Sequence, residues 1–367
     1  MRDVPGTRQA LPPFDQSAPA LSWFEFWPAW LFYLPMWLWI GWLAFRHRGV
    51  RLPLLANPRF PAGGLVGESK REIFAQLRGE ECATLAPYAV LFRSGSAATQ
   101  LVDAEIRMKR AGFTYPAVAK PDMGCRGAGV RPVRDARELL AYLAAFPKRQ
   151  CLIIQEMVQA EGEAGIFYIR KPGAKQGEIF SLTLKYFPHI LGDGIRTIEQ
   201  LIRGDARAAR IAHLYLPRFA GRLDDVPASG EAVRLVFAGN HCRGAIFRDG
   251  RRWITEAMRA RFDRIADCIP DFHFGRFDIR FADFGALRRG EDFTIVEFNG
   301  AGAEATHIWD SRMTLTGAWR TLMHQYAMLF EIGAANRARG HRPESLWRVF
   351  RRWRGEKRAS LRYPPTA

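Results

Sequence analysis

Apolar and polar residues alternate with a period of two along much of the chain, and this pattern predicts strands. The clearest runs are 178–186, 276–281 and the stretch that ends at Val296-Glu-Phe-Asn299. Shorter apolar runs predict further strands at 117–120, 130–133, 152–158, 165–170, 232–240 and 245–247. Apolar positions at helical spacing predict helices near 71–77, 99–110, 136–146, 197–202 and 255–268. Hairpin connections dominate and no regular βαβ repeat is present, so we expect an α+β fold.

The N-terminal region departs from this pattern because residues 26–45 carry no charged side chain. That is about the length that a helix needs to cross a hydrocarbon core of roughly 30 Å. The stretch is rich in tryptophan, which favours the headgroup level, and Pro28 and Pro35 each remove a helix hydrogen bond. We therefore expect residues 21–50 to form a membrane helix that either spans the bilayer or lies in its interface. An apolar element of a soluble fold is the alternative.

The net charge of the chain predicts an anionic partner. The chain has 54 Lys and Arg against 37 Asp and Glu, a formal net charge of +17. Basic residues follow the apolar segment directly, so the rest of the chain should face the cytoplasm from the inner membrane. Residues 336–367 interleave aromatic and basic positions, which is typical of a helix on anionic lipid, although a solvated chain end would look the same. No nucleic-acid module is visible, so we rank nucleic acid below a membrane surface.

A lysine and a glycine-rich loop suggest phosphate chemistry. Lys120 ends a predicted strand, and glycines follow at 124, 127 and 129. Glycines at this spacing let backbone N–H groups approach phosphate oxygens, and the lysine adds a positive charge. The alternative is a glycine-rich hairpin that binds no phosphate, which would have the same sequence pattern. Lys185 ends a second polar strand face, for which a surface salt bridge is the simpler interpretation.

Oxygen-bearing side chains on two late strands suggest a metal site. Strand alternation places Arg276 and Asp278 on one face, and Glu297 and Asn299 likewise flank Phe298 on one face. Carboxylate and amide oxygens suit Mg²⁺, which keeps part of its water and bridges phosphates. Upstream, the residues from Glu156 to Glu163 offer backbone amides for an adenine edge and a carboxylate for ribose hydroxyls. Solvated glutamates would give the same pattern.

Taken in chain order, these pieces closely resemble the ATP-grasp ligase superfamily, which includes D-alanine:D-alanine ligase, glutathione synthetase and the cyanophycin synthetases. The pieces are the lysine and glycine loop, Ile153-Ile-Gln-Glu156, the lysine strand, Arg276-Phe-Asp278 and Glu297-Phe-Asn299-Gly300. The resemblance covers about residues 110–330. It implies two α+β subdomains that clasp ATP, at 111–187 and 188–335, after a tail at 1–20, the membrane helix and a reduced region at 51–110. A basic amphipathic tail at 336–367 would complete the chain.

The resemblance also implies roles for single residues. Lys120 and Lys185 would contact the phosphates and Arg276 would stabilise the acyl-phosphate transition state. The remaining nucleotide contacts would come from Gly124, Gly127, Gly129, Glu156, Val158 and Glu163, with the last at the ribose. Asp278, Glu297 and Asn299 would bind magnesium, with two ions expected and Mn²⁺ as an alternative. His241 and His307 are candidates for substrate contact, with a structural role as the simpler interpretation of each.

These roles predict a membrane-anchored, ATP-dependent carboxylate-amine ligase that forms an acyl phosphate and releases ADP and phosphate. Its carboxylate donor and amine acceptor remain undefined, and a lipid-linked one would explain the anchor and the basic charge together. A D-alanine:D-alanine-type cell-wall ligase is the nearest alternative, and a kinase is another. An alternative outside the enzymes is a membrane-bound sensor or scaffold that binds ATP without turning it over.

Overall fold

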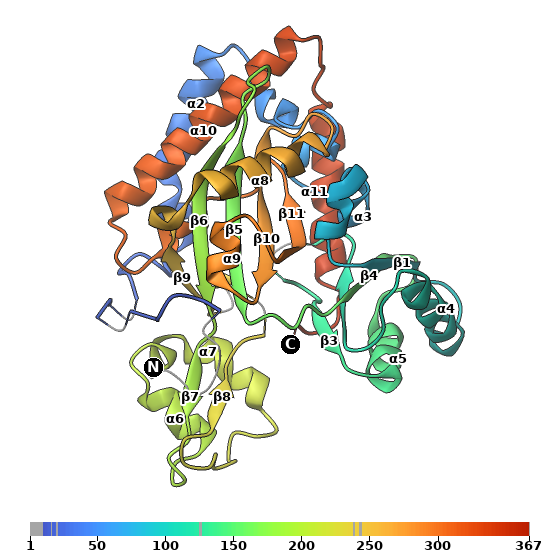
Figure 1. Ribbon diagram of the computed structural model, residues 1–367, viewed down its shortest axis with the longest axis vertical. Helices are drawn as coiled ribbons and strands as arrows, with labels where there is room; N and C mark the ends of the chain where they lie inside the picture. The colour runs from blue at the N-terminus through green and yellow to red at the C-terminus, as the bar shows by residue number, and fades with distance from the viewer. Residues whose placement is uncertain are drawn as a thin grey trace.

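A five-stranded antiparallel sheet in the order β11–β10–β5–β6–β9 occupies the centre of the molecule (Figure 1). The computed structural model describes residues 10–15, 17–19, 21–124, 127–237, 239–241 and 244–366. The strands of this sheet are β5 (Gly162–Ile169), β6 (Glu178–Tyr186), β9 (Ile246–Asp249), β10 (Phe274–Phe281) and β11 (Phe293–Asn299). All four pairings are antiparallel, which agrees with the hairpins expected from the sequence.

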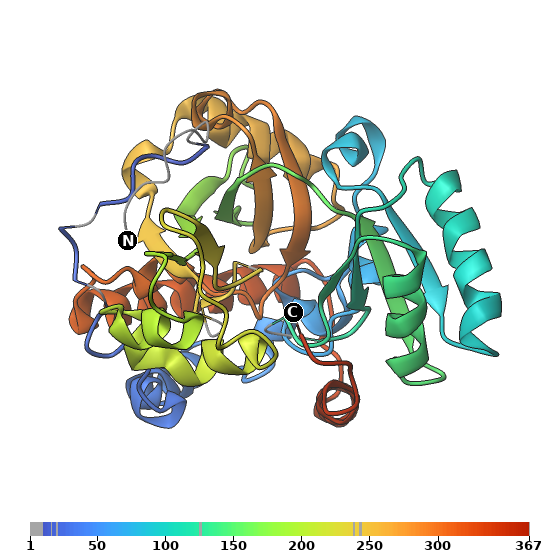
Figure 2. The same cartoon turned by 90° about the horizontal axis from the view of Figure 1, so that it is seen from below.

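Helices cover both faces of this sheet. The apolar face packs against α8 (Glu256–Asp267) and α9 (Phe284–Arg288), with Phe262, Phe277 and Ile295 in its core. The long helix α10 (Leu315–Ala338) lies across the other face, where Met328 and Ile332 meet Phe167 at one end of the strands. Figure 2 shows the sheet between these two layers. The part of the second face that α10 leaves uncovered carries the polar residues of the candidate site.

A second, four-stranded sheet in the order β1–β4–β2–β3 forms a separate lobe beside the first (Figure 2). Its strands are β1 (Tyr88–Phe92), β2 (Ala117–Pro121), β3 (Arg131–Val133) and β4 (Cys151–Glu156). Helices α4 (Ala97–Arg110) and α5 (Ala136–Ala145) cover one face and share a core with Leu91, Leu139 and Ile154. Ser96 and Asp135 cap these helices by accepting from backbone N–H groups of the first turn.

A third group of elements extends below the large sheet in Figure 1. It contains β7 (His189–Leu191), β8 (Ala232–Arg234), α6 (Ile198–Gly204), α7 (Ala212–Tyr215) and the short 3-10 helices η4 (Ala208–Ile211) and η5 (Leu216–Phe219). Thr197 and Gln200 form a capping box at the start of α6, where the sequence predicts a helix start. The strand predicted at 232–240 ends at Arg234, so the prediction of its length was wrong.

The apolar N-terminal segment does not form one long helix. It is divided at Tyr33 into α1 (Ala29–Phe32) and α2 (Leu34–Arg46). Pro28 directly precedes α1, and Pro35 is the second residue of α2. Within the described parts of the chain, no helix has the length and apolar character required to cross a bilayer. Met36 and Leu43 of α2 are instead buried against α10. Residues 21–50 therefore do not form the single helix that the sequence predicted, and the contact of this segment with a membrane stays a prediction.

The segment between α2 and the small lobe wraps around the large sheet. It contains η1 (Leu52–Leu55), η2 (Pro61–Gly64), α3 (Lys70–Phe74) and η3 (Gly79–Thr84). Asn57 fixes it by donating to the carbonyl oxygens of Gly63 at 3.1 Å and Phe274 at 2.8 Å. The remaining elements are η7 (Arg251–Trp253), η8 (Thr306–Trp309) and the C-terminal helix α11 (Leu346–Ser360).

Candidate active site

Strand register gathers polar side chains on one face of the large sheet. Asp278 lies opposite Glu297, and Arg276 lies opposite Asn299, in the β10–β11 pair. On the other side of β10, Arg280 pairs with Glu163, which in turn pairs with Lys185 of β6. Directly opposed residues of an antiparallel pair share a face and lie close together. The register therefore brings charged residues from four adjacent strands to one surface.

Lys185 is the centre of a buried charge cluster on this surface. Its Nζ atom lies 2.8 Å from Oδ1 of Asp278 and 3.0 Å from Oε1 of Glu163, and its side chain is almost fully buried. Burial alone would lower the pKa of Lys185, but the two carboxylates raise it above its ordinary value. Lys185 is therefore a fixed positive charge at the base of the site.

Asp278 is also held by Arg276, which lies two residues earlier on the same strand face. The Arg276 guanidinium donates from Nε to Oδ1 at 3.2 Å and from Nη2 to Oδ2 at 3.3 Å. Burial raises the pKa of Asp278, but Arg276 and Lys185 outweigh it and bring the pKa to about 2. A third donation, from Nη1 of Arg276 to the carbonyl oxygen of Glu304 at 3.1 Å, orients the guanidinium toward the loop before η8.

The residues predicted to hold adenine and ribose lie at the hinge between the two sheets. Glu163 is buried and accepts from Lys185 and, at 3.1 Å, from Nη2 of Arg280. The same arginine donates to the carbonyl oxygen of Val158 at 3.2 Å, so the hinge is tied to the sheet. Glu156 is exposed at the end of β4. The roles of Glu156, Val158 and Glu163 toward a nucleotide stay predictions.

Lys120 joins the two sheets. It belongs to β2 of the small sheet, where its Nζ atom donates to Oε1 of Gln155 at 2.7 Å. It also donates to the carbonyl oxygen of Val296 on β11 of the large sheet at 3.1 Å. Burial lowers the pKa of Lys120 to about 8, although the carboxylate of Glu297 opposes this shift. The predicted phosphate lysine therefore lies at the junction of the lobes, next to a predicted metal ligand.

The glycine-rich loop follows directly from β2. Gly124, Gly127 and Gly129 all have positive φ angles. A side chain on Gly129 would approach Pro121 and Tyr363 to within 2.9 Å, so only glycine fits there. Cys125 and Arg126 of this loop lie outside the described residues.

The end of the chain covers the glycine-rich loop. Tyr363 donates from its hydroxyl to the carbonyl oxygen of Met123 at 2.8 Å. Oγ1 of Thr366 accepts from the N–H of Gly129 at 3.1 Å and donates to the carbonyl oxygen of Gly127 at 2.9 Å. A backbone donor that the sequence assigns to phosphate thus has a hydroxyl partner from the same chain.

Sequence reasoning missed two further charged residues of the site, Glu68 and Lys70. Nζ of Lys70 lies 3.4 Å from Oε1 of Glu297 and donates to the carbonyl oxygen of Gly124 at 3.0 Å. Glu68 accepts from the N–H of Gly300 at 2.8 Å, and burial raises its pKa to about 7. The available signal was the Gly63-to-Lys70 segment, which has glycines and a lysine but no preceding strand. It reaches the site because Ser69 and Arg71 both bond to Asp122, just after β2.

The predicted metal ligands fit a magnesium ion that is held together with nucleotide phosphates. Across the described ranges, no group of three or more His, Cys, Asp and Glu side chains is suited to hold a metal by itself. Asp278 and Glu297 are nevertheless direct cross-strand partners, and Asn299 lies on the same face. The Asn299 amide, oriented to satisfy its neighbours, has its nitrogen 3.2 Å from Glu297 Oε1 and 3.3 Å from Glu68 Oε2. One or two carboxylates with retained water and phosphate oxygens is the usual environment of protein-bound Mg²⁺.

Both histidines singled out from the sequence are buried near this face. His307 accepts or donates through Nδ1 to Oγ of Ser181 at 2.6 Å, and burial lowers its pKa to about 4. His241 stacks against Trp309 at a centroid distance of 4.8 Å and contacts Glu25 through Nε2 at 3.1 Å. Whether either contacts a substrate stays a prediction.

The N-terminal segment packs beside His241 and close to Arg276. The hydroxyl of Tyr33 donates to Oε1 of Glu304 at 2.6 Å, and the carbonyl oxygen of Glu304 binds Arg276. Glu25 is buried and forms an ion pair with Arg207 at 2.7 Å. The segment expected in a membrane thus contributes side chains next to the predicted catalytic arginine.

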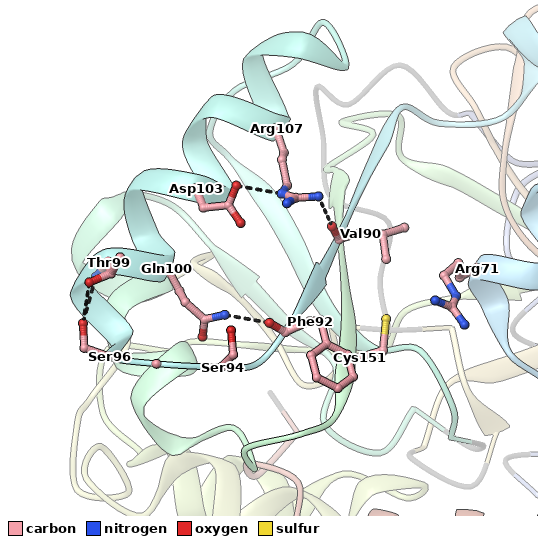
Figure 3. Close-up of a pocket in the computed structure, with 11 residues that line it drawn as sticks. Arg71, Val90, Phe92, Ser94, Ser96, Thr99, Gln100, Asp103, Arg107 and Cys151 are labelled. Atoms are coloured by element: carbon pink, nitrogen blue, oxygen red, sulfur yellow. Dashed lines mark hydrogen bonds and ion pairs between the residues drawn. The ribbon is translucent and has the colours of Figure 1, made fainter.

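A cavity of about 570 Å³ lies elsewhere, beside the outer strand of the small sheet (Figure 3). It is lined by residues of α4 and β1 together with Arg71 and Cys151, and none of the predicted site residues line it. Arg107 and Gln100 of α4 donate to the carbonyl oxygens of Val90 and Phe92, as Figure 3 shows. This part of the strand edge is therefore already hydrogen-bonded, and the sheet face remains the better candidate.

Comparison with known proteins gives structural neighbours only. No protein-family model matches the sequence, and no curated protein matches it. Solved structures similar to the chain include ligases and synthetases. One is D-alanine–D-alanine ligase from Bacillus anthracis, at 14% identity and a TM-score of 0.39. The match covers 74% of this chain and 68% of the chain of that ligase. A bifunctional glutathione synthetase from Pasteurella multocida has 16% identity and a TM-score of 0.35, and covers 69% of this chain.

The chain spans only part of these proteins. It covers 35% of the glutathione synthetase and 59% of the ATP-grasp ligase PsnB, which has 15% identity and a TM-score of 0.35. At identities and TM-scores this low, a conclusion about activity has to come from the residues of the site.

Proposed function

We propose that this chain is an ATP-dependent carboxylate-amine ligase of the ATP-grasp type, which forms an acyl phosphate and releases ADP and phosphate. One observation carries the proposal. The buried cations Lys120 and Lys185, together with the partly buried Arg276, surround the cross-strand pair of Asp278 and Glu297 where the two sheets meet. This arrangement supports binding of a polyanionic substrate, because the buried ammonium of Lys120 bonds to two neutral oxygens and a nearby anion would offset the cost of its burial.

The expected chemistry follows from the charges. An oxygen of the donor carboxylate attacks the γ-phosphorus, the bond to ADP breaks, and negative charge spreads over the phosphoryl oxygens. Arg276 and the lysines stabilise that charge in a site from which water is excluded. Asp278, Glu297 and Asn299 would hold Mg²⁺, which supplies charge neutralisation at the phosphates when it is bound. The amine nitrogen then attacks the acyl carbon, phosphate leaves, and the nitrogen loses a proton.

The N-terminal segment supports a substrate that is presented at a membrane surface, as a lipid-linked donor or acceptor. Tyr33 is the junction of α1 and α2, and its hydroxyl reaches Glu304 next to Arg276. The same α2 continues away from the site with a strongly exposed apolar face, on which Leu38 is 74% and Phe45 is 84% exposed. One short segment therefore connects the arginine side of the site with the apolar surface.

The test is product analysis with ATP, Mg²⁺ and panels of carboxylates and amines, including D-alanine and membrane lipid extracts. We expect ADP, phosphate and a new amide, detected by mass spectrometry. Asp278→Asn should reduce turnover by about 10²-fold or more, because the carboxylate that would hold Mg²⁺ at the phosphates is lost. Asp103→Asn, which changes an exposed carboxylate on α4, is the matched control.

Three outcomes would replace the proposal. A D-alanyl dipeptide formed equally well without lipid would identify the cell-wall ligase alternative. ADP that appears without any amide would indicate a kinase. ATP binding with no turnover, and no effect of Asp278→Asn in the cell, would indicate a sensor or scaffold.

A further inference from the structure

Helix α2 presents an apolar face to the outside of the molecule. Its inner face carries Met36 and Leu43, which are buried against α10. At 100° per residue, Leu34, Leu38 and Phe45 lie on the opposite side of the helix. They are 51%, 74% and 84% exposed. The two flanks of this face carry further exposed tryptophans, Trp37 and Trp42.

Helix α11 repeats this arrangement with more charge. Its inner face contacts the body through Glu356, whose Oε2 accepts from the N–H of Gly67 at 2.9 Å, and through the buried Ala359. The opposite face carries Trp347 and Phe350, which are 65% and 41% exposed, with Trp353 at its border. The rings of these three residues form a continuous row at centroid distances of 5.9 Å.

The two helices lie on the same side of the molecule. In Figure 2, α2 in blue and α11 in dark red both project from the lower edge of the view, and both are seen nearly end-on. In Figure 1 both run close to the long axis of the molecule. Their axes are therefore roughly parallel, and their outer faces can meet one flat surface together.

Basic groups surround the aromatic rings of both helices. Arg46 lies over the ring of Trp42, Arg354 over Phe350, and Lys357 over Trp353, with centroid distances from 4.7 to 5.7 Å. Six basic residues lie within α11, namely Arg348, Arg351, Arg352, Arg354, Lys357 and Arg358. A cation beside an exposed aromatic ring suits the boundary between headgroups and acyl chains, where the ring enters the apolar layer and the cation meets lipid phosphate.

We propose that α2 and α11 together form a docking surface that binds in the plane of an anionic phospholipid bilayer. Exposed tryptophan, leucine and phenylalanine insert to the depth of the acyl boundary, and the basic groups bind headgroup phosphates. The excess of positive charge, +17 for the chain, complements a negative lipid surface and disfavours pairing with a second copy of the same chain. The ligase activity is a separate proposal, and neither depends on the other.

Vesicle co-sedimentation of the full chain tests the surface. Vesicles that contain phosphatidylglycerol should bind the chain at least about tenfold more tightly than vesicles of phosphatidylcholine alone, and high salt should remove most of the difference. Two double variants, Leu38→Ser with Phe45→Ser on α2 and Trp347→Ser with Phe350→Ser on α11, should each weaken binding by about tenfold or more. The control is Val102→Ser with Ile106→Ser, which removes two exposed apolar side chains from α4 in the small lobe.

Each outcome decides the proposal. Equal binding by all variants, or no preference for anionic lipid, would overturn it. A dimer by analytical ultracentrifugation that dissociates in the α2 or α11 variants, without lipid binding, would assign the surface to a second copy. Circular dichroism and thermal unfolding confirm that the variants fold. ATP turnover is measured on the same preparations without lipid, so a failed ligase assay leaves the docking result intact.

Discussion

Lys120 and Val296 connect the two sheets of the protein through one hydrogen bond, from the buried ammonium of β2 to the carbonyl oxygen of β11. Because Glu297 follows Val296 directly, this contact also sets the distance between a candidate phosphate ligand and a candidate metal ligand. Movement of one lobe against the other would change both contacts at once. The junction is therefore the place where changes in charge should have the clearest effect on nucleotide binding.

The pH dependence of ATP binding should report on Lys120. Burial lowers its pKa to about 8, so the ammonium loses its proton as the pH rises through that value. We expect ATP affinity to fall above about pH 8 in the wild-type chain. Lys120→Met should bind ATP more weakly by about tenfold or more and should remove this alkaline dependence. Isothermal titration calorimetry from pH 6.5 to 9.5 measures both, and an unchanged alkaline limb in the variant would assign it to another group.

Loss of Lys185 should destabilise the fold as well as the site. Lys185→Met leaves the buried carboxylates of Glu163 and Asp278 without the ammonium between them. Removing one partner from a buried ion pair costs about 3–5 kcal/mol, because the remaining charge stays desolvated. Urea unfolding should show this loss in the free energy of unfolding. Lys171→Met, which breaks an exposed ion pair with Glu331, should change it by less than about 1 kcal/mol.

Glu68 should make the protein less stable as the pH rises from about 4.5 to 7. Burial raises its pKa to about 7 in the folded state, so over this range the folded chain binds more protons than the unfolded chain. The penalty for ionising Glu68 is absent below this range and complete above it. Glu68→Gln keeps a carbonyl oxygen for the N–H of Gly300 and removes the charge.

We therefore expect Glu68→Gln to be more stable than the wild type at pH 8 and equally stable at pH 4.5. Thermal unfolding at both pH values measures the difference. A stability gap that is equal at the two pH values would show that Glu68 does not titrate between them.

Thr366 should compete with nucleotide for the glycine-rich loop. Its hydroxyl occupies the N–H of Gly129, which the sequence assigns to phosphate binding. Thr366→Val removes this competing hydrogen bond, a contact of about 0.5–1.5 kcal/mol, so ATP should bind roughly two- to tenfold more tightly. Thr366→Ser keeps the hydroxyl and should bind like the wild type. Weaker binding by the valine variant would instead show that the chain end supports the loop.

Local patterns predicted the elements that place most of the candidate site. The strand at 178–186 has the predicted bounds, and alternation put Arg276 with Asp278 on one face of β10. Their convergence with Glu297 follows from hairpin pairing, which is a local feature. Glu68 and Lys70 could not be predicted in this way, because contacts through Gly300, Gly124 and Asp122 bring them to the site from a distant segment.

The apolar N-terminal segment shows the same limit of local reasoning. Its hydropathy is typical of a membrane helix, and nothing within residues 26–45 indicates that one side of it is already covered. That cover comes from α10, where Leu322 and Phe330 contact the cores that contain Met36 and Leu43. The packing of α2 against α10, two segments far apart in the chain, decides which side of α2 is buried and which is exposed. Only the structure shows this packing.

Helix α11 holds the body of the protein from two directions. On its inner side Glu356 bonds to Gly67, next to Glu68, and beyond its last turn Tyr363 and Thr366 hold the glycine-rich loop. Its outer side is the face that we assign to lipid. If α11 binds the bilayer as we propose, a tilt of this helix would move Gly67 and the glycine-rich loop together, so attachment to lipid would be coupled to the geometry of the candidate site.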